Sequence, residues 1–137
     1  MRLLDTNVVI DCFGEGAKLQ DWAAGQIARA VREDGAAINP VALAEASLRL
    51  DIEDVKARLK RMGVQFVPLP IAASGPAARA FAIYLQRRKS DAPPPRIPLP
   101  DFFIGAHAEA EAWTVVTHDA ARFRTYFPKV KIIAPAK

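Results

Sequence analysis

Five short apolar runs alternate with segments of helical periodicity, and this alternation limits the folds that the chain can adopt. The runs lie at residues 2–4, 36–38, 64–67, 114–117 and 130–133. Runs of this kind are typical of buried strands, and strands that alternate with helices favour a parallel sheet, because each crossover helix packs back onto the sheet. We therefore expect an α/β fold with three layers, α/β/α, around a central and mainly parallel sheet.

The expected helices follow from the capping residues, glycines and prolines between these runs. They cover residues 8–13, 19–33, a segment beginning at Asn39-Pro40, 51–62, 75–90, 101–112 and a turn at 120–123. Five prolines occur between residues 91 and 100, where we expect a stiff loop, because proline lacks the backbone donor that regular structure needs. No internal repeat divides the chain.

One domain over residues 1–137 accounts for this length, because such a chain buries about two thirds of its unfolded surface and needs no staples. Its single cysteine, Cys12, stands in an apolar stretch and fits a small core residue in a reducing compartment. No run of about 18 uncharged apolar residues occurs, and Asp5 comes too early for the core of a signal peptide. We expect a soluble, cytoplasmic protein with no membrane partner.

Four acidic residues stand close to the ends of the expected strands. Asp5 directly follows the first strand, Glu45 lies on the helix after the second, Asp101 begins the helix after the proline loop, and Asp119 follows the strand at 114–117. Sites in open parallel sheets form at the carboxyl ends of the strands, so acids there are candidates for chemistry. Structural roles stay open for three of them: a helix cap for Asp5, a favourable helix dipole for Asp101 and a side-chain turn for Asp119.

Two of these acids share a helix face with apolar residues three, four or seven positions away. The two sets are Val41, Ala44, Glu45 and Leu48, and Asp101, Ile104, Gly105 and Ala108. We expect both carboxylates to point toward the core. Buried carboxylates that lie close together repel one another, and each costs several kcal/mol when unpaired, so something cationic must lie among them.

The four acids offer oxygen ligands without cysteine or a histidine pair nearby, and such ligands favour Mg²⁺ or Mn²⁺ over zinc. An ion of this kind keeps several waters and binds substrate phosphates. It activates a water for in-line attack and stabilises the leaving oxygen, which is the chemistry of phosphodiester hydrolysis. The acids therefore predict a metal-dependent hydrolase.

Four segments together carry a resemblance to a known family. They are Leu3-Leu4-Asp5-Thr6-Asn7-Val8-Val9-Ile10-Asp11, Glu45 in its short helix, Pro100-Asp101-Phe102-Phe103-Ile104-Gly105-Ala106-His107-Ala108, and Thr117-His118-Asp119. With these segments in this order, the chain resembles the PIN-domain ribonucleases, and in particular the VapC toxins of bacterial toxin–antitoxin pairs. The agreement runs over the whole chain.

This resemblance implies a PIN-like fold and an RNA endonuclease that uses Mg²⁺ or Mn²⁺. It implies that Asp5, Glu45, Asp101 and Asp119 are catalytic and bind the metal, with polar support from Thr6, Asn7 and Thr117. It also implies a homodimer and a cognate antitoxin protein that blocks the site. Two features depart from the family pattern: His118 replaces the expected asparagine or arginine, and residues 93–100 are unusually rich in proline.

Basic residues are concentrated near the proline loop. The net charge is +4, and residues 63–100 hold five bases against one acid. Arg87, Arg88 and Lys89 end a helix, where cations also complement the helix dipole, and Arg96 lies in the loop. Because an acidic metal site needs a basic rim to hold an RNA backbone, we expect these four residues to bind RNA.

Other functions fit parts of the sequence. A metal-independent ribonuclease would use His107 and His118 as acid and base, but His107 lies about 120 degrees from Asp101 around its helix. A phosphatase with an aspartyl intermediate would need an acid where Asn7 stands. A PIN-like nuclease without a toxin role, or a binding module of the same fold without catalysis, also stays open.

Overall fold

The central sheet has its strands in the order β3-β2-β1-β4-β5, and every neighbouring pair runs parallel. The computed structural model describes residues 1–97 and 99–136. The strands are β1 (Arg2–Leu4), β2 (Ala36–Ile38), β3 (Gln65–Phe66), β4 (Thr114–Val116) and β5 (Ile132–Ile133). The expected parallel sheet is confirmed, although β3 and β5 are shorter than the apolar runs at 64–67 and 130–133.

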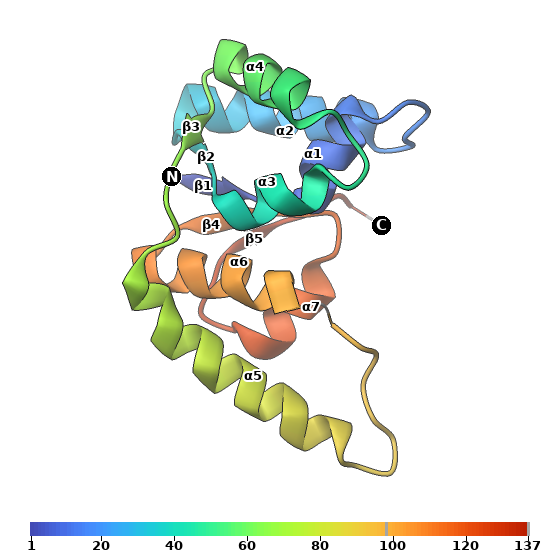
Figure 1. The fold of residues 1–137 in the computed structure, drawn as a ribbon, viewed down its shortest axis with the longest axis vertical. Helices are drawn as coiled ribbons and strands as arrows, with labels where there is room; N and C mark the ends of the chain where they lie inside the picture. The colour runs from blue at the N-terminus through green and yellow to red at the C-terminus, as the bar shows by residue number, and fades with distance from the viewer. Residues whose placement is uncertain (98, 137) are drawn as a thin grey trace.

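Helices flank this sheet in a three-layer α/β/α arrangement (Figure 1). They are α1 (Thr6–Phe13), α2 (Gln20–Glu33), α3 (Pro40–Ala46), α4 (Ile52–Met62), the 3₁₀ turn η1 (Ile71–Ala73), α5 (Ser74–Arg88), α6 (Leu99–Glu111) and α7 (Ala120–Tyr126). Asp5, Asn39 and Asp51 cap α1, α3 and α4 by accepting a backbone N–H, as their places in the sequence indicate. Among the helices of residues 1–97 and 99–136, none has the length and apolar character needed to cross a bilayer.

The order of the strands creates a crevice between β1 and β4. From β1 the chain continues to β2 and β3 on one side, and it returns to β4 and β5 on the other. In Figure 1 the blue to green half of the chain accordingly lies above the orange to red half. Ligands of open parallel sheets bind where the strand order reverses, outside the carboxyl ends. Here Leu4 pairs with Val116 at that point, directly before Asp5 and Thr117.

The helix that carries Asp101 begins earlier than expected. α6 begins at Leu99, so Leu99 and Pro100 belong to its first turn and not to the proline loop. Proline is favoured in a first turn because the first N–H groups of a helix have no partner within it. Pro98, predicted in the loop, and Lys137, predicted at the end of the domain, lie outside the described residues.

The prediction for the buried face of α3 is wrong. Ala42 and Ala46 are fully buried, whereas Ala44 is exposed and Leu48 is 83% exposed. The reason is that α3 ends at Ala46, before Leu48, and that the two small side chains, four residues apart, let α3 pack against α1 and α6. Glu45 therefore lies half-buried at the margin of the core and not within it.

The corresponding prediction for α6 is confirmed. Asp101, Ile104, Gly105 and Ala108 are all buried on one face. A Cβ atom at Gly105 would overlap the ring of Phe127, so only glycine lets α6 approach this ring so closely. The close approach fixes the position of α6, and with it the position of Asp101.

Candidate active site

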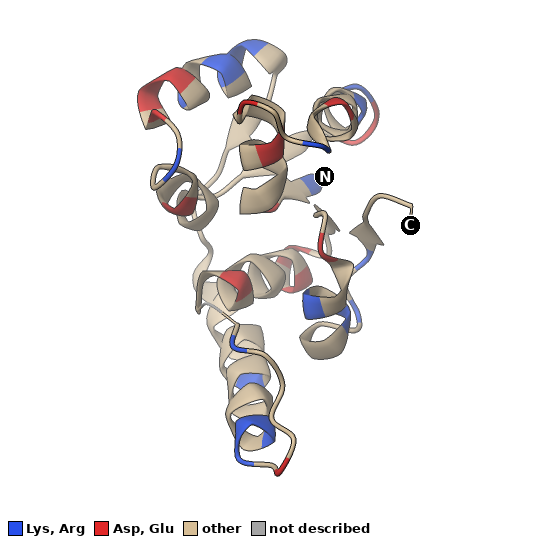
Figure 2. Cartoon of the chain, turned by 90° about the vertical axis from the view of Figure 1, so that its right-hand side faces the viewer, with Lys and Arg blue, Asp and Glu red and all other residues tan. Residues whose placement is uncertain are grey.

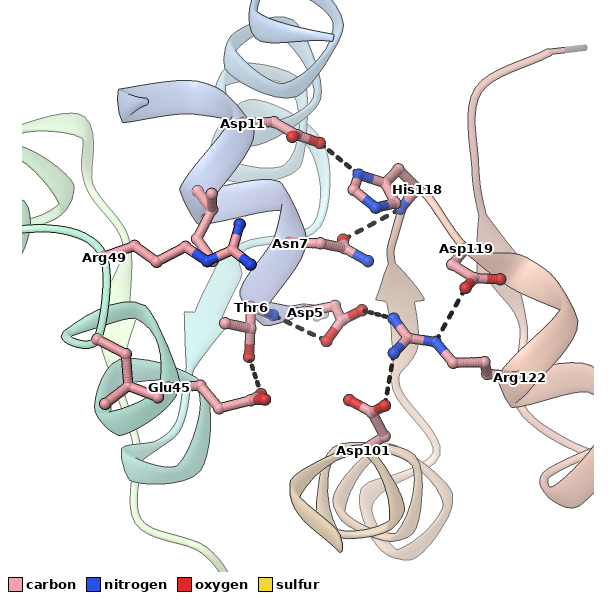
Figure 3. A pocket seen from close by; sticks show the side chains of 12 residues that line it. Asp5, Thr6, Asn7, Asp11, Glu45, Arg49, Asp101, His118, Asp119 and Arg122 are labelled. Atoms are coloured by element: carbon pink, nitrogen blue, oxygen red, sulfur yellow. Dashed lines mark hydrogen bonds and ion pairs between the residues drawn. The ribbon is translucent and has the colours of Figure 1, made fainter. Parts of the chain in front are cut away.

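A pocket of about 420 Å³ lies at the carboxyl ends of β1 and β4 (Figure 3). The four predicted acids come from different parts of the chain, and all of them line this pocket. They are Asp5 after β1, Glu45 on α3, Asp101 on α6 and Asp119 after β4. The structure thus brings the four acids together, while their binding of a metal stays a prediction.

Asp5 is the most buried of the four acids, with 1% of its surface exposed. One carboxylate oxygen accepts the backbone N–H of Thr6 at 2.8 Å, which caps α1, and the other accepts the hydroxyl of Thr117 at 2.8 Å. Asp5 therefore caps α1 and also lines the pocket as one of its acids. Burial raises the pKa of Asp5, against the Thr117 hydrogen bond and the charge of Arg122, which lower it.

The three predicted supporting residues connect the elements around the pocket. The Thr6 hydroxyl donates to Glu45 Oε1 at 2.6 Å, which joins α1 to α3. The Asn7 amide group donates to Thr117 Oγ1 at 3.2 Å and accepts the backbone N–H of His118 at 3.1 Å. These bonds hold the segment after β4 against the start of α1.

A cation lies among the acids, and it is a side chain that the sequence analysis did not identify. Arg122 on α7 places Nη1 2.5 Å from Asp101 Oδ2, Nη2 3.5 Å from Asp5 Oδ2 and Nε 3.2 Å from Asp119 Oδ2 (Figure 3). The need for a cation was predicted from the acids alone. Arg122 follows Asp119 by three residues, a spacing at which acid and base pair on a helix. This spacing indicates the contact with Asp119 but not those with Asp5 and Asp101.

Two guanidiniums line this pocket, those of Arg122 and Arg49, and they do not balance its five carboxylates, which belong to Asp5, Asp11, Glu45, Asp101 and Asp119. Burial, together with the neighbouring carboxylates of Asp5, Glu45 and Asp119, raises the pKa of Asp101 to about 7, against the lowering effect of Arg122. In the metal-free protein Asp101 is therefore partly protonated at neutral pH. The carboxylates of the pocket can therefore accommodate more positive charge than Arg122 and Arg49 supply.

The donor set fits a hard divalent cation, but the carboxylates are not arranged around a common point. Carboxylate oxygens are the ligands that Mg²⁺ and Mn²⁺ prefer. Within residues 1–97 and 99–136, no three His, Cys, Asp or Glu side chains are close enough to share one metal ion. Figure 3 shows the reason: the guanidinium of Arg122 lies between Asp5, Asp101 and Asp119, and Glu45 turns to Thr6 on the other side.

The two histidines have different surroundings, and the structure does not bring them together as the acid and base of a metal-independent ribonuclease. His107 is 1% exposed, and we assign its Nδ1 as the acceptor of the Asn39 amide at 3.0 Å, because the Asn39 oxygen already accepts the N–H of Ala42. Burial lowers the pKa of His107, and this ring is absent from the pocket lining. His118 lines the pocket, with Nδ1 2.5 Å from Asp11 Oδ2.

The predicted RNA-binding residues lie at the end of α5 and in the proline loop that follows it. In Figure 2 the end of α5, at the lower tip of the molecule, is coloured blue for basic residues. Arg87 and Arg96 line a second pocket of about 460 Å³, which shares Asp119 and Arg122 with the acidic pocket. Arg88 donates to the carbonyl of Pro94 at 2.5 Å and so holds the loop to α5. Lys89 is exposed at the end of α5 and lines neither pocket.

The family model of the PIN domain matches residues 2–127. The chain belongs to the PIN domain family. This membership agrees with the parallel sheet and with the acids at its carboxyl edge. No curated protein matches the chain.

Solved PIN-like structures share this fold at low sequence identity. VapBC2 from Rickettsia felis, bound to a DNA fragment from their promoter, matches with a TM-score of 0.72 and 18% identity over 97% of each chain. FitAcB from Neisseria gonorrhoeae matches with a TM-score of 0.67 and 20% identity over 96% of each chain. A toxin–antitoxin complex from Klebsiella pneumoniae matches with a TM-score of 0.63 and 19% identity over 100% of this chain and 99% of the other.

The raised pKa of Asp101 predicts how the stability of the metal-free protein depends on pH. The pKa rises from 3.8 to about 7 on folding, so between these values the folded state binds more protons than the unfolded state. The stabilisation is present at low pH and lost as the pH rises through 7. We expect the unfolding free energy of the parent in EDTA to fall between about pH 5 and about pH 8. This fall should exceed that of Asp101→Asn by at most about 3 kcal/mol.

Denaturant titrations at both pH values measure this difference. Asp91→Asn is the matched control, because this substitution removes the same charge from an exposed residue in the loop after α5. The control should retain the parent's pH dependence. Equal pH dependence of the parent and Asp101→Asn would show that Asp101 ionises normally in the folded protein.

Proposed function

We propose that this PIN domain is an endoribonuclease that depends on Mg²⁺ or Mn²⁺ and acts in the cytoplasm as the toxin of a toxin–antitoxin pair. The observation that carries the proposal is the convergence of four acids, each from a different element, in one pocket at the reversal of the strand order. With Asp11, five carboxylates line this pocket against the two guanidiniums of Arg49 and Arg122. A pocket of this kind suits a divalent cation and repels the free substrate phosphate unless a cation is present.

The roles of the side chains follow from their positions. When bound, the ion would polarise a nonbridging phosphate oxygen and lower the pKa of a water that attacks in line. Asp5, Asp101 and Asp119 would hold it. Asp5 is fixed by Thr6 and Thr117, so its carboxylate needs little reorganisation. Glu45 is held at the opposite wall by the Thr6 hydroxyl, where it is available as a further ligand or to orient water.

The second pocket supplies a route for the RNA backbone. Its walls carry Arg87 and Arg96, and it meets the acidic pocket at Asp119 and Arg122. A strand that lies in it would place phosphates against arginine while its next phosphodiester reaches the acids. Arg88 supports this route by holding the loop, and exposed Lys89 adds to the positive field.

The toxin role rests on similarity of fold. The similar structures include VapBC2, FitAcB and a toxin–antitoxin complex, so we propose a cognate antitoxin protein as a partner of this chain. The homodimer that the family resemblance implies is part of the same proposal. A small reading frame beside the gene would encode that antitoxin. Without such a reading frame the proposal reduces to a PIN nuclease without a toxin role. Loss of all metal binding would favour the alternative of a binding module without catalysis.

Metal-dependent hydrolysis predicts the chemistry of the RNA ends. Total cellular RNA incubated with the protein and Mn²⁺ should yield fragments with 5′-phosphate and 3′-hydroxyl ends, because water and not the RNA 2′-hydroxyl is the nucleophile. EDTA should stop cleavage. Direct ligation of adapters that require a 5′-phosphate identifies the ends. Cyclic phosphate ends, or cleavage that persists in EDTA, would contradict the mechanism.

Matched variants distinguish loss of cleavage that is caused by a changed site from loss that is caused by misfolding. Asp5→Asn and Glu45→Gln should each abolish cleavage, and Glu45→Gln retains an oxygen that can accept from Thr6 and should preserve the fold. Glu53→Gln is the control, because Glu53 on α4 is 79% exposed and lies outside the pocket lining. It should cleave like the parent.

The second pocket predicts the salt dependence of RNA binding. In the Glu45→Gln background, which prevents cleavage, changing Arg87 and Arg96 to Ala should weaken binding of a single-stranded RNA. The slope of log K against log salt should flatten by about 0.7 for each lost phosphate contact. Fluorescence anisotropy at several salt concentrations measures the slope. The control pair Arg32→Ala and Arg61→Ala removes equal charge from exposed helix positions, and an identical slope in both pairs would remove the second pocket from the RNA route.

A further inference from the structure

Arg122 lies between three of the pocket acids and contacts each of them. Asp5 follows β1, Asp101 lies in the first turn of α6, and Asp119 precedes α7. The contact with Asp119 lacks hydrogen-bond geometry, and the buried Nε has no hydrogen-bond partner. The guanidinium therefore does not satisfy all of its own hydrogen-bond donors in this position.

We propose that Arg122 is a two-position residue that substitutes for the divalent cation in the metal-free protein and moves into the second pocket when the cation binds. This inference rests on the proposed metal-dependent function and adds a coupling between metal binding and the RNA route. The cation and Arg122 would compete, because Arg122 contacts Asp5 Oδ2 and Asp101 Oδ2 and the same two carboxylates would hold the cation. A divalent ion takes several oxygens at short range, which a guanidinium on those oxygens prevents.

The second pocket offers an alternative position for the Arg122 side chain. Its side chain is 26% exposed and lines both the acidic pocket and the second pocket. Turning the guanidinium from one to the other needs rotation of the side chain and no unfolding of α7. In the second pocket Arg122 joins Arg87 and Arg96, so metal binding would add an arginine to the surface proposed for the RNA backbone.

Removal of Arg122 tests the competition through metal affinity, without an activity measurement. Calorimetric titration with MnCl₂ should show that Arg122→Gln binds Mn²⁺ more tightly than the parent. If the open position holds about a tenth of the parent molecules, the gain is about tenfold. Arg124→Gln is the matched control, because Arg124 is exposed on the same helix and loses the same charge. It should stay within about twofold of the parent, since an exposed charge acts only through a screened field.

A second measurement observes Arg122 directly in the parent protein. The NMR signal of the Arg122 Nε–H, assigned by its absence from Arg122→Lys, should shift during titration with diamagnetic Mg²⁺. Arg122→Lys keeps the positive charge, so it also replaces Arg122→Gln in the Mn²⁺ titration if Arg122→Gln does not fold. A lysine reaches fewer of the three carboxylates at once, so its Mn²⁺ affinity should lie above that of the parent.

The outcomes distinguish this inference from the proposed function. Unchanged or weaker Mn²⁺ binding by both Arg122 variants, or an Arg122 signal that stays in place at saturating Mg²⁺, overturns the two-position arginine while leaving a metal-dependent nuclease intact. Failure of the parent and of every variant to bind either ion overturns both proposals. Tighter binding by the Arg122 variants with an unaffected Arg124→Gln supports the inference.

Discussion

Repulsion among four carboxylates is the constraint on which the site depends. Asp5 and Asp101 are almost fully buried, so water screens their charges poorly. Burial raises the pKa of both, Asp5 further raises that of Asp101, and Glu45 further raises that of Asp5. Replacing one of these carboxylates by an uncharged side chain would increase the stability of the fold. Arg122 relieves part of this repulsion, but burial and the neighbouring carboxylates still raise the pKa of Asp101. The residual negative charge is what makes the pocket a candidate for a divalent cation.

The fold supplies the means to hold these charges in place. β1 and β4 are neighbours because the strand order reverses between them, and this brings Asp5 and Asp119 to one edge from opposite ends of the chain. Ala42 and Ala46 let α3 pack closely, and Gly105 lets α6 approach Phe127, so both helices reach the same edge. The hydroxyls of Thr6 and Thr117 then orient the carboxylates. Small residues in the core thus permit the close approach of acids at its margin.

The sequence predicts most of the fold and the acids of the site because those features depend on local patterns. Capping by Asp5, Asn39 and Asp51 is a short-range signal, and the apolar runs locate the strands. The face of α3 was predicted wrongly because periodicity does not reveal where a short helix ends, and α3 ends before Leu48. Arg122 was missed because its partners Asp5 and Asp101 are distant in sequence, and only the fold brings them to it.

The measurement that tests the account most directly is X-ray diffraction at the manganese absorption edge from crystals grown with saturating MnCl₂. The account predicts an anomalous peak in the acidic pocket in contact with Asp5 and Asp101, and the Arg122 guanidinium turned away from both carboxylates. An acidic pocket without an anomalous peak, in which Arg122 keeps its contacts to Asp5 and Asp101, would contradict it.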